Sequence, residues 1–397
     1  MSKKFIKKEY QKTPATFFAR AAEIKNSQTN IIDLSLGDPD LKTAAEIVNQ
    51  AAADANQGYT HYAHPRGDFE LREAIVAYYK KNYNQLIDLD QIMITVGACH
   101  GTFLALAAIL NEGEEIIIPT PYFAPYKGQV ELAGGKAVFV KSKFEADFQL
   151  DLDAVEEKIT PKTKAILINS PHNPTGIIQK KKVLEKLIEL AIKYDILILS
   201  DEVYENFDYK SEFYSLVNFN KQSDRIIILN SFSKTFAMTG WRLGFLIADP
   251  DLINVMQNLN EGICYSAPSI SQRAAIKALT SENLKEEIRN CFAKRVSYAN
   301  QIISANSELD LVKAEGAFYL FPRIKKTGLK AEEFALRLLK EEGVLVLPGD
   351  DFGDQNGEFI RIACTLELSK LTEALARICS FTKKLKDDNL SNSKLNK

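Results

Sequence analysis

The chain has 397 residues, of which 46% are hydrophobic and 26% are charged, and its formal net charge is −2. These values are typical of an ordinary soluble globular protein. They exclude an overall attraction to nucleic acid or to an anionic membrane, which requires a strong excess of basic residues. A chain of this length can bury a large core, and we expect it to form two domains.

We expect no targeting segment and no membrane span in this chain. The N-terminal stretch "MSKKFIKKEYQ" is basic but is not followed by an apolar segment. No apolar run approaches the roughly 18 residues that a membrane helix needs, so a cytoplasmic location is expected. The five cysteines form no CxxC pair and the four histidines form no HExxH motif. Neither a disulfide framework nor a metal site is therefore predicted.

Short runs rich in Val and Ile alternate with helical segments over much of the chain. Uninterrupted apolar runs are typical of strands that helices cover on both faces in a mostly parallel sheet. The predicted strands are "QIMITV" (91–96), "EIIIP" (115–119), "KAVFVK" (136–141), "KAILIN" (164–169), "DILILS" (195–200) and "RIIILN" (225–230). Residues 99–110 and 180–194 carry apolar residues at helical spacing. The pattern predicts a large α/β domain over residues 41–285.

The rest of the chain mixes short strands with helices. A charged helical stretch after residue 285 is followed by the apolar runs "GVLVLPG" and "EFIRIACT" and by the helical pattern "LSKLTEALARICSF". We predict a smaller α+β domain that combines residues 1–40 with residues 286–385. Residues 386–397 belong to a segment too polar to bury a face, and they are predicted to form a disordered tail.

Polar side chains follow four of the predicted strands. Asn169 ends one strand and leads into "SPHNPTG", and Asp201 ends another and leads into "EVY". A third strand leads into Ser231, Ser233 and Lys234, and "GACHG" follows the first strand at the start of a helix. Ligands of open α/β sheets bind at the carboxyl ends of the strands. Four polar strand ends therefore predict one shared site.

The residues at these strand ends suit an aldehyde that carries a phosphate. A lone lysine at a strand end is more often part of a solvated loop, but a desolvated lysine such as Lys234 can form a Schiff base with an aldehyde. The hydroxyls of Ser231 and Ser233, the guanidinium of Arg242 and the backbone N–H groups of residues 97–99 could together bind a phosphate.

The remaining polar residues suit a pyridine ring. Asp201 would be costly to bury unless it met a cation, and a protonated pyridine nitrogen is such a cation. Tyr204 and Asn173 could hydrogen-bond a phenolic oxygen on the ring, and Phe123 could stack on its face. The predicted ligand is pyridoxal 5′-phosphate.

Several motifs together resemble the class I and II aminotransferases, which are pyridoxal-phosphate enzymes of fold type I. The motifs are "SLGDPD", "NSPHNPTG", "SDEVY", "SFSK" with "GWRLG", "GAFYLFP", "PGDDFG" and "EFIRIA", and they extend from about Ile32 to Ala363. The resemblance implies a mostly parallel seven-stranded sheet between helices, with a smaller α+β domain. It also implies a ping-pong transfer of an amino group from an L-amino acid to a 2-oxo acid such as 2-oxoglutarate.

The resemblance assigns roles to individual residues. Lys234 resembles the Schiff-base lysine that also moves the proton, Asp201 the partner of the ring nitrogen, and Tyr204 a donor to the ring oxygen. The implied cofactor-binding residues are Tyr62, Ala98, Cys99, Phe123, Asn173, Asp201, Tyr204, Ser231, Ser233, Lys234 and Arg242.

Tyr62 matches a tyrosine that reaches the phosphate of the neighbouring subunit in this family, which implies a homodimer with shared active sites. The alternative is that Tyr62 is simply an exposed tyrosine in an aromatic loop, where Tyr59 is equally available.

Substrate binding is assigned to Gly37, Asn173 and Arg361. The planar guanidinium of Arg361 suits the α-carboxylate of an amino acid, and the family carries its carboxylate-binding arginine in this motif. The alternative for Arg361 is a side chain that reaches solvent from a sheet edge. Gly37 would let the backbone approach the same carboxylate.

Two positions bear on the amino-acid donor. One bacterial subgroup resembling aspartate aminotransferases has a lysine for the distal carboxylate at the position of Cys99, and Gly262 replaces an arginine of other aspartate enzymes. Phe17 and Phe18 lie in an N-terminal segment that closes over the substrate in relatives, and we expect them to shape the apolar side of the pocket. The alternative is that both belong to the core. We therefore favour an aromatic or neutral donor. Aspartate aminotransferase is the alternative, and a pyridoxal-phosphate C–S β-lyase is the alternative of another class.

Overall fold

The computed structural model describes residues 5–7, 17–26, 29–281 and 283–395 of the chain. A seven-stranded sheet with the strand order β2-β8-β7-β6-β5-β3-β4 lies at its centre. The strands are β2 (Ile92–Thr95), β3 (Glu115–Thr120), β4 (Lys136–Lys141), β5 (Thr163–Asn169), β6 (Leu197–Asp201), β7 (Ile226–Ser231) and β8 (Gly244–Ile247). Strand β8 pairs antiparallel with β2 and β7, and the other pairs are parallel. The predicted seven-stranded, mostly parallel sheet is confirmed.

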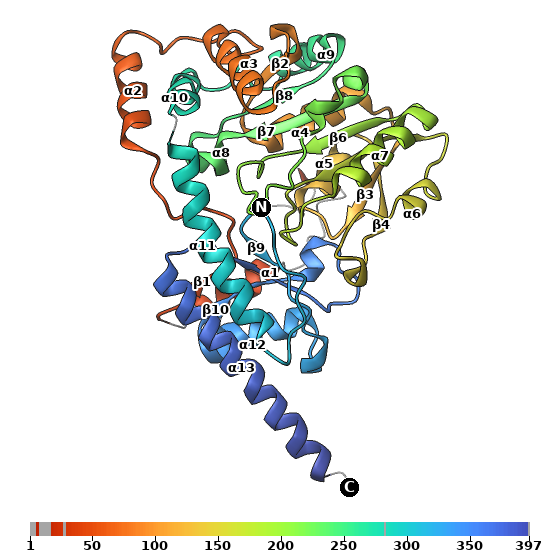
Figure 1. Cartoon of the computed structure of the whole chain (residues 1–397), viewed down its shortest axis with the longest axis vertical. Helices are drawn as coiled ribbons and strands as arrows, with labels where there is room; N and C mark the ends of the chain where they lie inside the picture. The colour runs from red at the N-terminus through yellow and green to blue at the C-terminus, as the bar shows by residue number, and fades with distance from the viewer. Residues whose placement is uncertain (1–4, 8–16, 27–28, 282, 396–397) are drawn as a thin grey trace.

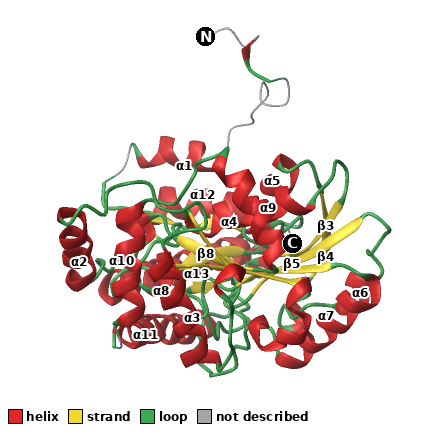
Figure 2. Cartoon of the chain, turned by 90° about the horizontal axis from the view of Figure 1, so that it is seen from above, coloured by secondary structure: helices red, strands yellow, loops and turns green. Residues whose placement is uncertain are grey.

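Helices cover both faces of this sheet (Figure 2). They include α2 (Ala45–Asn56), α3 (Phe69–Tyr83), α4 (Gly97–Ile109), α5 (Pro125–Leu132), α6 (Leu152–Glu156), α7 (Lys181–Tyr194), α8 (Phe232–Thr235), α9 (Pro250–Glu261) and α10 (Ser269–Thr280). Successive strand residues alternate between the faces: Ile226 and Ile228 pack with α3 and α7, and Ile227 and Leu229 pack with α4 and α9. Because both faces are buried, the central positions of these strands are apolar on both sides, and the polar residues lie toward the strand ends.

Below the large sheet in Figure 1, the last part of the chain and an N-terminal segment together form two small sheets with their own helices. Strands β11 (Leu347–Pro348), β12 (Ile360–Ala363) and β9 (Tyr319–Leu320) form one antiparallel sheet, and β1 (Ile32–Asp33) pairs with β10 (Val344–Leu345). The helices here are α1 (Phe17–Lys25), α11 (Leu284–Ser304), α12 (Ala331–Glu342) and α13 (Leu368–Leu395). One large apolar cluster holds these elements together. We propose that it is the core of a second domain of residues 1–40 and 286–385.

The predicted disordered tail is wrong as far as the structure describes it. Helix α13 continues to Leu395 (Figure 1), through ten of the residues assigned to that tail, 386–395. A helix closes its backbone hydrogen bonds within its own segment, so a polar composition does not prevent it from forming. Residues 396–397 lie outside the described residues.

Two further findings limit the kinds of site that this fold carries. Within the described residues, no helix is both long and apolar enough to cross a membrane. The same part of the chain shows no group of three or more His, Cys, Asp or Glu side chains arranged to hold a metal ion.

Candidate active site

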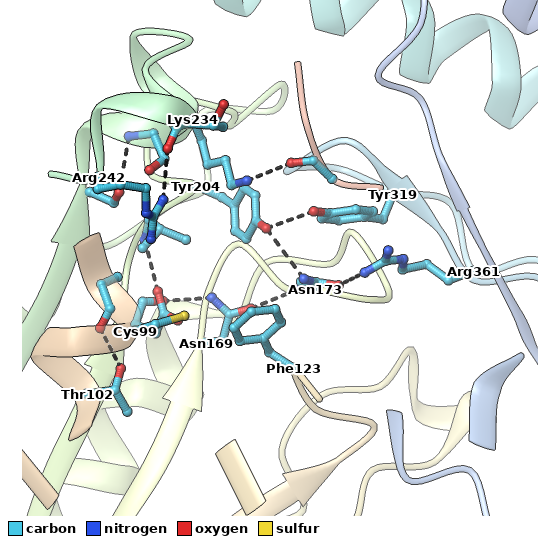
Figure 3. Close-up of a pocket in the computed structure, with 17 residues that line it drawn as sticks. Cys99, Thr102, Phe123, Asn169, Asn173, Tyr204, Lys234, Arg242, Tyr319 and Arg361 are labelled. Atoms are coloured by element: carbon cyan, nitrogen blue, oxygen red, sulfur yellow. Dashed lines mark hydrogen bonds between the residues drawn. The ribbon is translucent and has the colours of Figure 1, made fainter. Parts of the chain in front are cut away.

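A cavity of about 200 Å³ opens at the carboxyl ends of β5, β6 and β7, beside the start of α4 (Figure 3). Its lining also includes Tyr319 and Arg361, from the small sheet of β9, β11 and β12, and Gly37, which follows β1 in the chain. The predicted residues that line it are Gly37, Ala98, Cys99, Phe123, Asn173, Asp201, Tyr204, Ser231, Ser233, Lys234, Arg242 and Arg361. The predicted site residues thus meet in one place, except for Tyr62.

Lys234 lies in the short helix α8, directly after β7. The side chain of Ser231 caps this helix by accepting a hydrogen bond from the backbone N–H of Ser233, at 3.1 Å. The Nζ atom of Lys234 donates to the carbonyl oxygen of Gly37 at 2.6 Å. Burial lowers the pKa of Lys234 to about 8, although the nearby carboxylate of Asp38 opposes this shift. About a tenth of the amine is therefore unprotonated at pH 7, far more than for an ordinary lysine, and this form can act as a nucleophile.

Donors to an anion surround the start of helix α4. Gly97 has a φ of +75°, and a Cβ atom there would lie 2.8 Å from Nη2 of Arg242. Glycine therefore lets the guanidinium lie against the first turn of the helix, where backbone N–H groups are unpaired. Nη1 of Arg242 donates to the carbonyl oxygen of Thr239 at 2.8 Å, which holds the side chain in place. This set of donors suits a phosphate.

Asp201 is a buried carboxylate at the end of β6, and only 5% of it is exposed. It accepts hydrogen bonds from the hydroxyl of Tyr126 and from the backbone N–H of Val203. Burial raises the pKa of Asp201 to about 6 despite these bonds. The charge of Lys234 lowers this pKa only slightly, and within the described part of the chain no Lys or Arg forms an ion pair with Asp201. A protonated ring nitrogen would supply the missing partner.

Arg361 lies on the opposite side of the view from Arg242, and Tyr204 and Asn173 lie between them (Figure 3). The Nδ2 atom of Asn173 is 3.4 Å from the Tyr204 hydroxyl, and its Oδ1 accepts from Nη1 of Arg361 at 3.1 Å. The Tyr204 hydroxyl is also 2.9 Å from that of Tyr319. One hydrogen-bonded chain thus joins the predicted ring-oxygen donors to the predicted carboxylate-binding arginine.

Arg361 is not at a sheet edge. It lies in β12, the middle strand of its sheet, and is 5% exposed. Its guanidinium carbon is 4.6 Å from the ring centres of both Tyr319 and Phe352, and Nη2 donates to the carbonyl oxygen of Ser35. The buried Nε atom has no hydrogen-bond partner in the structure. A buried cation with an unused donor suits a carboxylate ligand.

Position 37 has room only for glycine, because Tyr319 fills the space that a side chain would need. A Cβ atom at Gly37 would lie 1.8 Å from the hydroxyl oxygen of that tyrosine. Phe123 lines the cavity and packs edge-on against Tyr126, with ring centres 5.4 Å apart. Cys99 also lines the cavity, and burial raises the pKa of its thiol.

Tyr62 and Phe17 do not line this cavity. Tyr62 is 88% exposed, and its ring packs edge-on against Tyr265. Phe17 belongs to the apolar cluster around β9 to β12. The expectation that Phe17 shapes the substrate pocket is therefore wrong, because its side chain serves the core. The side chain of Phe18 lies outside what the structure describes.

Sequence reasoning did not assign three residues that complete the site. Tyr126 holds Asp201, Tyr319 holds Tyr204 and covers Arg361, and Asn169 donates to the carbonyl oxygen of Asp201 at 2.8 Å. Tyr126 lies three residues after Phe123, and Tyr319 lies in the motif "GAFYLFP", so both were close to residues that the sequence had indicated. Nothing in those stretches indicated which aromatic ring faces the cavity.

Comparison with known proteins decides the family. The family model described as aminotransferase class I and II matches residues 29–378. The chain belongs to this family. It is 41% identical to aromatic-amino-acid aminotransferase 2 of Thermococcus litoralis, over 90% of this chain and 92% of that protein. It is 40% identical to an aspartate aminotransferase of Pyrococcus abyssi, with the same two coverages. The structure of an aromatic aminotransferase from Pyrococcus horikoshii matches with a TM-score of 0.87 and 38% identity, over 92% of this chain and 99% of that one.

This protein is therefore an aminotransferase that depends on pyridoxal 5′-phosphate. The cavity fits that cofactor on three observations. Asp201 is a buried carboxylate that forms no ion pair within the described residues, Gly97 leaves room for Arg242 beside a helix start, and Lys234 has a lowered pKa. These features match a ring nitrogen, a phosphate and an aldehyde, in that order.

Proposed function

We propose that this aminotransferase takes its amino group from an aromatic or neutral L-amino acid and passes it to a 2-oxo acid such as 2-oxoglutarate. This proposal rests on which positively charged side chains line the cavity. Among the described residues, the Lys and Arg side chains that line it are Lys234, Arg242 and Arg361. The cofactor would take the first two and the α-carboxylate the third, so none of these three side chains of this chain would remain for a distal carboxylate. The Thermococcus litoralis relative, named for aromatic amino acids, supports the same class.

We assign the substrate's α-carboxylate to Arg361 and Asn173. Stacking between Tyr319 and Phe352 fixes the plane of the guanidinium, and a fixed fork binds a carboxylate through two parallel hydrogen bonds. The carbonyl oxygen of Gly37 accepts from Nζ of Lys234 at 2.6 Å, which supports a carboxylate beside Gly37 with the α-carbon of the substrate within reach of Nζ.

The cofactor supplies an electron sink that makes the α-proton acidic when it is bound. Nζ of Lys234 would take up this proton and give it back on the other side of the step, which needs an amine of moderate basicity. A pKa of about 8 meets that need. Asp201 keeps the ring nitrogen protonated, and Tyr204 with Asn173 donates to the ring oxygen. In the second half-reaction the same groups act in reverse on the 2-oxo acid, so we expect ping-pong kinetics.

Aspartate aminotransferase is the second candidate. The Pyrococcus abyssi relative and a Bacillus subtilis relative at 38% identity carry that name. The two candidates differ in one requirement, because an aspartate enzyme needs a cation or several donors for the distal carboxylate. The side chain at position 99 is a thiol that cannot supply the charge.

We propose a homodimer with shared active sites and a cytoplasmic location. The side chain of Tyr62 is 88% exposed and does not line the cavity of its own chain. Its ring packs edge-on against Tyr265. Such a side chain is available to a neighbouring subunit. The five cysteines are all free, which suits a reducing compartment.

Competing donors under one acceptor test the substrate class. With 2-oxoglutarate fixed, kcat/KM is measured for phenylalanine, alanine and aspartate. An uncompensated carboxylate costs a few kcal/mol, so aspartate should be about a hundredfold poorer than the best of the others. A tenfold or greater lead for aspartate would refute the proposed substrate class and leave the aminotransferase activity intact.

A further inference from the structure

Two carboxylates lie behind the loop that carries Asp201 and Tyr204. Residues 201–205 place Asp201 and Tyr204 in the cavity, whereas Glu202 and Glu205 are absent from its lining. Both glutamates are nonetheless buried, with 1% of Glu202 and 8% of Glu205 exposed. Charged residues are almost never this buried unless they are paired, so each needs a structural reason.

Glu205 is held by two tyrosines of helix α3. Its Oε1 accepts from the hydroxyl of Tyr78 at 2.5 Å, and its Oε2 accepts from the hydroxyl of Tyr83. Burial and the adjacent carboxylate raise the pKa of both tyrosines well above the usual value, so both remain donors. The ammonium of Lys285, in helix α11, donates to the Tyr78 hydroxyl at 2.7 Å. The charge of Glu205 is therefore balanced through a tyrosine rather than by direct contact.

Glu202 ties the same loop to a different part of the chain. Its side chain accepts from the hydroxyls of Ser200 and Ser215, at 2.9 and 2.5 Å, and from the backbone N–H of Leu216 at 2.9 Å. Its own carbonyl oxygen accepts from the backbone N–H of Glu205 at 2.9 Å. Hydrogen bonds to Glu202 and to Glu205 thus fix the turn of residues 201–205.

A third tyrosine of helix α3 connects to the neighbouring strand end. The hydroxyl of Tyr79 lies 3.5 Å from Nδ2 of Asn230, and Oδ1 of Asn230 accepts from the backbone N–H of Ser231 at 2.7 Å. Ser231 caps the helix that carries Lys234. One face of α3 therefore braces the end of β7 as well as the loop after β6.

We propose that Glu205 is a positioning residue of the active site, which acts with Tyr78 and Tyr83 to hold Asp201 and Tyr204 against the cofactor ring. This inference rests on the roles proposed above for Asp201 and Tyr204. The two tyrosines grip both oxygens of the carboxylate, so the turn that ends in Glu205 cannot rotate without breaking two buried, charge-assisted hydrogen bonds. Tyr204 itself has only a 3.4 Å contact with Asn173 and a 2.9 Å contact with Tyr319 to orient its hydroxyl.

Two variants of this cluster and two matched controls test the proposal in the holoenzyme. Glu205→Gln keeps the shape of the side chain but replaces one acceptor oxygen with a donor. Tyr83→Phe removes one of the two hydrogen bonds to Glu205. The controls are Glu156→Gln and Tyr194→Phe. Tyr194 donates a tyrosine-to-glutamate hydrogen bond to Glu156 at 2.6 Å, and neither residue lines the cavity. The readouts are the pH titration of the cofactor's visible absorbance, kcat and KM separately, and the thermal midpoint of the cofactor-free protein.

We expect Glu205→Gln to shift the midpoint of the absorbance titration by about 0.5 pH unit or more. It should lower kcat about tenfold, with KM changed less than about threefold, because orientation at the reacting centre is lost rather than carboxylate binding. Tyr83→Phe should move the same quantities in the same direction by about half as much, and the controls should leave them unchanged.

The proposal is overturned if both cluster variants keep the wild-type titration midpoint and kcat and lower only the thermal midpoint. If Glu205→Gln does not fold, Tyr83→Phe and Tyr78→Phe decide on the same readouts. The titration needs no amino-acid donor, so its result does not depend on the proposed substrate class.

Discussion

Replacement of Asp201 by Asn should have opposite effects on the cofactor-free protein and on the loaded enzyme. In the cofactor-free protein the carboxylate is buried, and its pKa is about 6 against a usual value of 3.8. The difference of 6 − 3.8 corresponds to about 3 kcal/mol, at about 1.4 kcal/mol for each pH unit. Ionised Asp201 therefore destabilises the fold by up to that amount when no cation faces it.

The sign of the pH dependence follows from proton uptake. Between pH 3.8 and about 6 the folded protein binds more protons at Asp201 than the unfolded chain does. Stability from this group is therefore lost as the pH rises through that window, and the full penalty is present above pH 6. Asn carries no charge, so the penalty disappears, although one of the two hydrogen bonds from Tyr126 and Val203 is weakened.

Urea unfolding of the cofactor-free proteins measures this effect. At pH 8 we expect Asp201→Asn to be more stable than the wild type by about 1 to 3 kcal/mol, and at pH 5 the gap should shrink. With cofactor bound, the variant should lose transamination by several orders of magnitude, because the ring nitrogen is no longer held protonated. A cofactor-free variant that is less stable than wild type at pH 8 would refute the electrostatic argument, and near-normal turnover would refute the role of Asp201.

Three further substitutions have distinct expected outcomes. Lys234→Ala should abolish transamination and the visible absorbance of covalently held cofactor while the far-UV circular dichroism stays normal; retention of that absorbance would contradict its role. Arg361→Lys should lower kcat/KM by about a hundredfold or more for every amino acid, because an ammonium cannot keep the stacked, two-pronged geometry; a loss for one donor alone would count against α-carboxylate binding. Tyr62→Phe should weaken cofactor affinity, measured by fluorescence, by about three- to tenfold; unchanged affinity in a proven dimer would show that Tyr62 does not reach the phosphate.

The sequence by itself determined the central sheet and the cofactor chemistry. Strands buried on both faces are uninterrupted apolar runs, so six of the seven could be located from composition alone. The seventh, β8, was not located, because its short apolar run "GFLIA" (244–248) directly follows the motif "GWRLG" and shares Gly244 with it. Asp201 could be assigned because it ends strand β6, and Lys234 and Asn173 because they lie in the short segments after β7 and β5. The position of a strand end is a local property of the chain.

Only the tertiary structure decided which side chains act on those residues. The partner of Asp201 is Tyr126, 75 positions away, and the partner of Glu205 is Tyr78, 127 positions away. The sequence could not distinguish an edge arginine from a buried one at Arg361, since that depends on which strands flank β12. Hydrogen-bond partners and burial are set by the packing of distant segments, whereas strand and helix patterns are set by neighbouring residues. The cofactor was therefore predictable from the chain, and the support that orients its binding residues was not.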